Sequence, residues 1–182
     1  VTGDIININS SVNVKTEGRP DNPSSSAFIG SENTQKVTIQ VTEGNALSVS
    51  GSNLSIRGQN IEIRTKEDNL VTGHGSSVIG GEETNLISIS GGTYGLSLLP
   101  YNSEPETNGT LTAKTVDISA SNSGLWVQNN STGYEGAYAQ LTVNADNIVI
   151  NAGRNGVVAM SQGAVELNGN VYINAENALL AR

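Results

Sequence analysis

The strongest constraint in this sequence is a short apolar–polar–apolar pattern that recurs along the whole chain. Its seven copies begin at Val12, Val37, Ile61, Ile87, Val116, Ile148 and Val171. They follow one another at intervals of 25, 24, 26, 29, 32 and 23 residues. Recurrence at about 20 to 50 residues is typical of repeat proteins, in which each repeat packs on the next. We therefore expect copies of one small structural unit to be stacked along an axis.

The clearest copy of this unit runs from Leu141 to Ala159. Apolar residues alternate with polar ones through 141–145, 148–152 and 157–159. Alternation with a period of two predicts strands that have one buried face and one solvent-facing face. The three strands are short and their corners lack the hairpin signature, so they are not expected to pair with one another. Each strand is expected to pair with its counterpart in the next repeat.

These features predict an all-β right-handed parallel β-helix with three short strands per coil and about seven coils, because connections between parallel strands are almost always right-handed. The recurring pattern marks the middle strands. First strands are expected at Ile6, Leu54, Leu111, Leu141 and Val165, and third strands at Leu47, Leu70, Leu96, Leu125, Val157 and Leu179. In the first coil, Ile6 and Val12 would then begin the first and middle strands, and the third strand is not located.

Residues 1–182 are expected to form a single domain, interpreted as a fragment of a longer protein. Three loop insertions are predicted, at 15–27, 99–110 and 128–140. The last two belong to successive coils, so they are expected to leave the solenoid at the same corner, one above the other. Insertions in repeat proteins map to loops on one face, which is often the binding face.

Trp126 lies between two apolar residues, Leu125 and Val127, which are expected to point inward. Its own side chain should therefore point outward, with Ser97 and Val158 at the same position in the neighbouring coils. An outward indole at the base of a loop can stack on a sugar ring or a partner side chain. The alternative is that the loop folds back and covers the indole.

The two paired insertions also carry tyrosines and carboxylates, which suit carbohydrate or protein recognition on a protruding surface. The candidate ligand-binding residues, besides Trp126, are Tyr101, Glu104, Glu106, Tyr134, Glu135 and Tyr138. Alternatively, these side chains only anchor their own loops.

Catalysis is the competing interpretation, because β-helix scaffolds are familiar as pectin-type lyases and hydrolases. Glu62 and Asp117 occupy outward positions two coils apart, about 9 to 10 Å, near the upper limit for an inverting pair of carboxylates. No constellation of Lys, Arg or His residues is expected around them, except for Arg64. We expect no enzymatic activity and no cofactor.

No metal site is predicted, because the chain has no cysteine and His74 is its only histidine. The net charge of −8 argues against nucleic acid as a partner, since phosphate affinity comes from Lys and Arg. No apolar run is long enough to span a bilayer, so the fragment is not expected to insert into a membrane. Stacked amide ladders are expected at Asn60, Asn147 and Asn170, and at Asn151 and Asn174.

Coils such as NIVINAGRNGVVAMSQGAVELNGNVYINAENALLA resemble the passenger region of bacterial autotransporters, the type V secreted surface proteins. The resemblance covers residues 37–182 and rests on I-x-I-x-A, a glycine corner and V-x-A. It implies a protein on the bacterial cell surface or secreted, and a role as an adhesin. The expected partners are host or bacterial glycans or proteins, or another copy of the chain. A spacer without a binding site and a polysaccharide-cleaving enzyme remain the alternatives.

Overall fold

The computed structural model describes residues 1–15, 26–50, 52–66, 70–72, 75–99, 106–128 and 138–182. Within these ranges the chain is all-β, and every strand pairing is parallel. None of these residues belongs to a helix that could cross a membrane.

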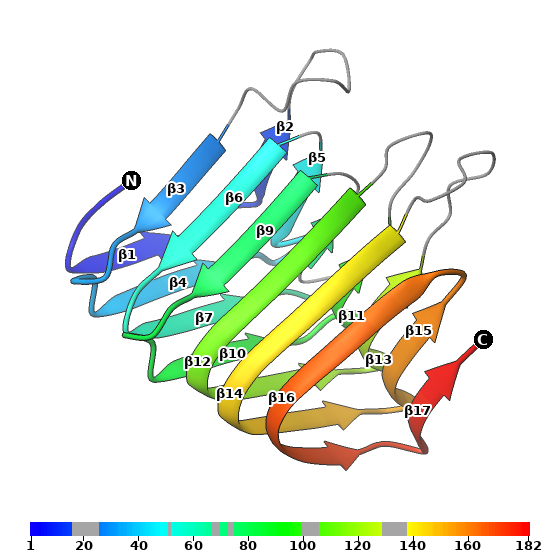
Figure 1. Cartoon of the computed structure of the whole chain (residues 1–182). Helices are drawn as coiled ribbons and strands as arrows, with labels where there is room; N and C mark the ends of the chain where they lie inside the picture. Colours follow the sequence, from blue (N-terminus) through cyan, green and yellow to red (C-terminus); the bar gives the residue numbers. More distant parts are fainter. Residues whose placement is uncertain (16–25, 51, 67–69, 73–74, 100–105, 129–137) are drawn as a thin grey trace.

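The strands stand in three columns, and each strand lies beside its counterpart from the next repeat (Figure 1). The first column holds β3 (Ser26–Gly30), β6 (Ser52–Arg57), β9 (Gly75–Gly80) and the N-terminal halves of β12 (Glu106–Ala120), β14 (Tyr138–Ala152) and β16 (Gly163–Asn174). The middle column holds β1 (Ile5–Ile8), β4 (Lys36–Gln40), β7 (Asn60–Arg64), β10 (Leu86–Ser90) and the C-terminal halves of β12, β14 and β16. The third column holds β2 (Val12–Lys15), β5 (Leu47–Ser50), β8 (Leu70–Thr72), β11 (Tyr94–Leu98), β13 (Ser123–Gln128), β15 (Asn155–Met160) and β17 (Asn177–Ala181). Because β12, β14 and β16 run unbroken around a corner, the first two columns form one 10-stranded sheet, and the third column is a separate 7-stranded sheet.

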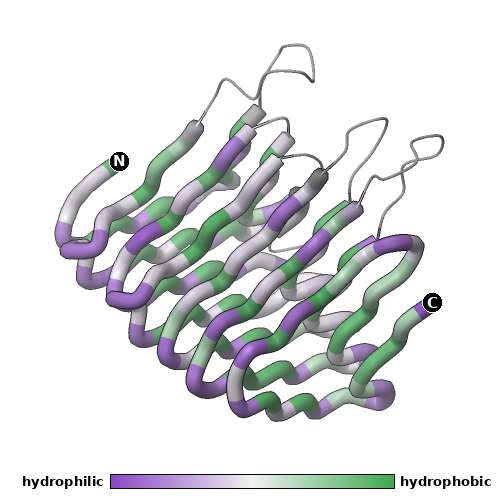
Figure 2. Tube along the Cα trace, viewed as in Figure 1, coloured by the Kyte–Doolittle hydropathy of each residue, from purple (hydrophilic) through white to green (hydrophobic). Residues whose placement is uncertain are grey.

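The core is a stack of buried aliphatic side chains. Hydrophobic and hydrophilic residues alternate along the strands (Figure 2). Ile63, Ile118 and Ile173 occupy one column, as predicted, through the pairs Ile63–Ile89, Ile89–Ile118, Ile118–Ile150 and Ile150–Ile173. The inward positions of the inner repeats are fully buried, as Ile63 and Ile150 illustrate. The predicted third-strand positions are also in register, from Leu47–Leu70 to Val157–Leu179.

The prediction for the first repeat was wrong by one strand. Ile6 pairs with Val37, so β1 is a middle strand and not a first strand. Val12 pairs with Leu47, so β2 is the third strand that the sequence did not locate. The error arose because Ile6–Ile8 and Val12–Val14 carry the same alternation, and only the pairing partner distinguishes their columns.

The corner between the first and middle columns is wider in two repeats than in the repeat between them. Five residues, 31–35 and 81–85, separate the strands there, against two residues, 58–59, in the repeat between them. Gly30 and Gly80 open these turns with φ angles of 75° and 81°, and a Cβ atom on either would lie 2.1 to 2.2 Å from a carbonyl oxygen of the next repeat. Only glycine accommodates this conformation and this approach.

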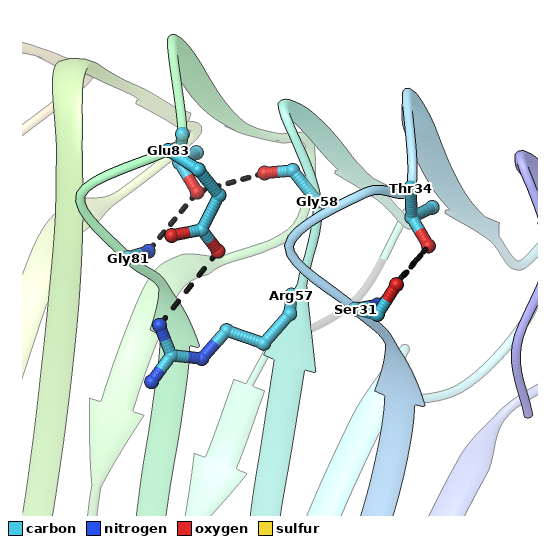
Figure 3. Close-up of polar contacts among 7 residues, drawn as sticks. Ser31, Thr34, Arg57, Gly58, Gly81 and Glu83 are labelled. Carbon is cyan, nitrogen blue, oxygen red and sulfur yellow. Dashed lines mark hydrogen bonds and ion pairs between the residues drawn. The ribbon is translucent and has the colours of Figure 1, made fainter.

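A threonine hydroxyl closes each wide turn (Figure 3). The Thr84 hydroxyl accepts a hydrogen bond from the Gly81 amide at 3.0 Å and donates to the Gly58 carbonyl at 2.7 Å. Thr34 does the same with the Ser31 amide at 3.0 Å and the Gly3 carbonyl at 2.8 Å. Both threonines are buried. The hydroxyl thus satisfies backbone groups of two successive repeats that the sheets leave unpaired.

Glycines in the third column allow the two sheets to approach closely. A Cβ atom on Gly95, Gly124 or Gly156 would lie 2.2 to 2.4 Å from the Cγ2 methyl of Ile118, Ile150 or Ile173, respectively. The glycines are in register with one another between the paired residues on either side. This glycine ladder therefore determines the distance between the middle and third columns.

The three insertions contain fewer residues outside the strands than the sequence predicted. The insertion predicted at 99–110 ends where β12 begins at Glu106, and the one at 128–140 ends where β14 begins at Tyr138. The insertion at 15–27 is bounded by β2, which ends at Lys15, and β3, which begins at Ser26. Polar residues at the first positions of these strands interrupt the apolar alternation, so the sequence pattern placed the strand starts too late. The remaining parts, 16–25, 100–105 and 129–137, lie outside the described residues.

The inward and outward assignment predicts unequal effects of two neighbouring truncations in β14. Ile150→Ala should reduce the free energy of unfolding by about 2–5 kcal/mol, because it leaves a cavity in the core. Val149→Ala, on the outer face, should cost well under half of that. Urea titration of both variants measures the difference, and equal losses would contradict the assignment.

The glycine ladder predicts that Gly124→Ala destabilises the chain by about 1–3 kcal/mol, since the added methyl overlaps Ile150 and the Gly156 carbonyl. Gly3→Ala is the matched control, because its added Cβ atom would make only ordinary contacts at 3.8 Å. Thermal unfolding followed by circular dichroism compares the two variants. A Gly124→Ala variant as stable as the control would show that the sheets are not in close contact there.

Candidate functional site

Trp126 lies on the outer face of the third column, in the register that the sequence predicted. It pairs with Ser97 of β11 and Val158 of β15. Leu125 and Val127 on either side are fully buried in the core, whereas Trp126 is partly exposed. The indole is therefore a surface group held on a rigid strand.

Two contacts orient the Trp126 side chain. Its ring lies against that of Tyr94, with the ring centroids 5.2 Å apart and the planes tilted by 59°. Its Nε1 donates a hydrogen bond to Gln128 Oε1 at 3.1 Å. Tilted aromatic pairs are stabilising, and the hydrogen bond to Gln128 satisfies the N–H group of the indole. The two rings form an aromatic surface that is fixed before any ligand binds.

This aromatic pair lines a groove of about 450 Å³ on the outer face of β11, β13, β15 and β17. We call it the Trp126 groove. Met160 and Leu180 add apolar surface, and Arg154 and Arg182 add positive charge. Concave sites with an apolar lining and a few polar groups are typical of small-molecule binding sites.

The side-chain oxygen of Asn122, which lines the groove, has no hydrogen-bond partner. This Oδ1 atom is buried, whereas the backbone carbonyl of Asn122 accepts two hydrogen bonds, from the Arg154 and Asn155 amides. The neighbouring amides are bonded to one another: Asn177 donates to Asn155 at 3.2 Å, and Asn155 donates to Ser123 at 3.3 Å. Burying an unpaired acceptor is costly, so Asn122 Oδ1 is an unsatisfied polar atom beneath the surface of the groove.

The amide ladder predicted from the sequence is formed in one place. Asn174 donates to Asn151 at 3.5 Å. Asn60 instead bonds to the Gln35 carbonyl at 3.2 Å, and Asn147 pairs in register with Asn170. The ladder through Asn155 and Asn177 next to the groove was not predicted.

The structure describes only part of the predicted loop site. Glu106 and Tyr138 begin β12 and β14 and pair in register, and Tyr138 is 37% exposed. The strands that precede the two insertions, β11 and β13, are also in register. Both insertions therefore leave and rejoin the sheets at the same corner, as predicted. Tyr101, Glu104, Tyr134 and Glu135 lie outside the described residues.

The two carboxylates of the alternative enzymatic site lie in one outward row with Ser88 between them, as predicted. However, Glu62 is engaged in ion pairs with Lys36 at 2.9 Å and Arg64 at 2.6 Å. The hydrogen bond from Lys36 lowers the pKa of Glu62, burial opposes this shift, and the charge of Arg64 adds to the lowering. A carboxyl group with a lowered pKa stays ionised and is poorly suited to general-acid catalysis.

Two further features concern a second hollow on the surface and possible metal ligands. A shallow channel of about 510 Å³ follows the corner between the middle and third columns, and its lining is mostly glycine, alanine and serine with Lys66 as its single charged residue. The described residues contain no group of three or more His, Cys, Asp or Glu side chains that could hold a metal. His74 lies outside the described residues.

Searches against protein-family models, curated proteins and solved structures found no match to this chain.

Sequence reasoning found Trp126 but missed the residues that complete its groove. Tyr94, Arg154 and Arg182 come from three different repeats, and each is unremarkable in its own segment. A signal was present, because the motifs around Gly95, Gly124 and Gly156 align the residue before each glycine. Writing the third strands one below another places Tyr94 in the row of Ser123 and Asn155, three residues away from the row of Trp126.

The ion pairs of Glu62 predict a pH-dependent contribution to stability. Because its folded-state pKa is lowered, the carboxylate stabilises the fold above its unfolded pKa, and this contribution is lost as the pH falls through the folded pKa. Glu62→Gln should therefore lower the free energy of unfolding by less than about 1 kcal/mol at neutral pH, as is usual for surface ion pairs. Urea titrations at several pH values should show the variant and the parent converging in acid; a gap that persists there would contradict the ion-pair origin.

Proposed function

We propose that this chain is a right-handed parallel β-helix of about seven coils, from a bacterial surface or secreted protein of the autotransporter type, and that it acts as an adhesin. The three columns of parallel strands and the in-register core support the coiled architecture. The resemblance of residues 37–182 to autotransporter passengers supports the origin. In such a protein the stacked coils provide a rigid stalk, and the outer face provides binding groups.

The observation that carries the proposal is the Trp126 groove. Binding surfaces are enriched in Trp, Tyr, Met and Arg, and the groove presents all four. The Tyr94 contact and the Gln128 hydrogen bond hold the indole in place, so little conformational freedom is lost when a ligand stacks on it. Recognition here needs no covalent chemistry.

The position of the insertions is consistent with this site. β13 ends at Gln128, which bonds to the indole, and the insertion at 129–137 follows directly. Met160, which lines the groove, pairs with Gln128 in the next repeat. The binding surface is therefore proposed to extend from the groove towards the two insertions, where Tyr138 and Glu106 rejoin the sheet.

A polysaccharide-cleaving activity is the less favoured alternative, because the ion pairs of Glu62 oppose its use as a proton donor. A spacer without a binding site would not require an aromatic groove. Self-association is a further route to adhesion, in which the partner is another copy of the chain.

The proposal predicts that Trp126→Ala abolishes binding of this chain to host or bacterial surface ligands, because the aromatic surface of the groove is lost. A glycan array and a panel of matrix proteins measure the binding, and sedimentation velocity measures self-association. Tyr172→Ala is the matched control, since Tyr172 is an outward aromatic on β16 that is 62% exposed and lies outside the groove. If Trp126→Ala binds as the parent does, or the parent binds nothing on either panel, the groove is not an adhesive site.

A further inference from the structure

The Trp126 groove concentrates positive charge in an acidic protein. The chain has a net charge of −8, with 17 acidic and 9 basic residues. Yet the described lining of the groove includes two arginines, Arg154 and Arg182, and no aspartate or glutamate. Such a local reversal of charge favours an anionic ligand over a neutral one.

The two arginines are also available for binding. Both are exposed, and neither forms a salt bridge with any described residue. The other arginines described, Arg57 and Arg64, each pair with a glutamate. The backbone at both positions is held by hydrogen bonds, from the Arg154 amide to the Asn122 carbonyl and from the Arg182 amide to the Ala159 carbonyl. The guanidinium groups therefore project from fixed points of the sheet and its end.

From this arrangement we propose that the Trp126 groove binds a saccharide that carries an anionic group, either a carboxylate or a sulfate. The proposal rests on the adhesive function above and names its ligand class. The sugar ring stacks against Trp126 and Tyr94, and the anion faces Arg154 and Arg182. Guanidinium groups bind carboxylate and sulfate oxygens through charge-assisted hydrogen bonds.

A sugar fits these groups better than an acidic peptide does. Extended peptides usually bind by adding a strand to an open sheet edge. Here β13 and β15 are paired on both sides, so the aromatic pair lies on a sheet face; of the strands that line the groove, only β17 has an open edge. A peptide on this face would have no strand edge to pair with at β13. A sugar acid supplies a ring for the aromatic pair and an anion for the arginines.

The test uses three ligands that share one lactose core: 3′-sialyllactose, 3′-sulfated lactose and lactose itself. Binding to the parent chain is measured by isothermal titration calorimetry and by saturation-transfer NMR. At least one of the anionic ligands should bind about tenfold or more tightly than lactose, and the stronger of the two identifies the carboxylate or the sulfate as the natural anion. Their affinity should fall as salt rises from about 0.01 M to about 1 M, where the screening length drops to about 3 Å.

The double variant Arg154→Gln, Arg182→Gln removes both charges and keeps polar side chains at both positions. It should lose about tenfold or more in affinity for the anionic ligand, while its weak lactose binding stays unchanged. Lys114→Gln is the matched control, because Lys114 is an exposed cation on β12 outside the groove. Its removal lowers the net charge without changing the site, so it should leave the affinity within about twofold. Circular dichroism confirms that the variants fold.

Three outcomes would overturn the ligand assignment: equal binding of lactose and both anionic sugars, equal losses in the double variant and the Lys114→Gln control, or tighter binding of a poly-glutamate peptide than of either anionic sugar. If these occur while Trp126→Ala still abolishes binding to the surface panel, the adhesive function stands and only its ligand class is wrong. If Trp126→Ala has no effect on either assay, both proposals fail.

Discussion

The structure depends on the in-register pairing of each strand with its counterpart one repeat away. This pairing satisfies the backbone along every column and, at the same time, stacks like side chains on like. Ile63, Ile118 and Ile173 therefore lie in one apolar column, far apart in sequence. The same register operates outside the core, so any outward residue meets its equivalents from the neighbouring repeats. Consequently, the chemical character of the surface is set column by column.

Because the columns satisfy most of the backbone, the corners can differ from repeat to repeat. The wide turns at 31–35 and 81–85 sit beside a two-residue corner at 58–59 without changing the register of the strands. Their extra backbone groups are satisfied by the buried hydroxyls of Thr34 and Thr84, each of which reaches the preceding repeat. The same tolerance allows insertions between the third and first columns, next to the Trp126 groove.

Two outward faces of the same scaffold have opposite chemical character. On the middle column, Glu62 forms ion pairs with both Lys36 and Arg64. On the third column, Arg154 and Arg182 lie around an aromatic pair without a described counter-ion. Charges that are already paired contribute little to recognition, whereas unpaired charges next to a concave apolar surface are available to a ligand. This contrast is the reason for proposing that binding takes place at the third column.

The sequence by itself determined the strand spacing, the inward and outward alternation, the outward position of Trp126 and the common corner of the two insertions. All of these follow from a period of two inside a longer repeat. Only the tertiary structure decided which column Ile6 and Val12 belong to, where β12 and β14 begin, and which outward residues surround Trp126. The reason is physical: alternation says which face a side chain occupies, but its neighbours come from other repeats. Tyr94, Asn122, Arg154 and Arg182 come together in one groove only when the repeats are stacked.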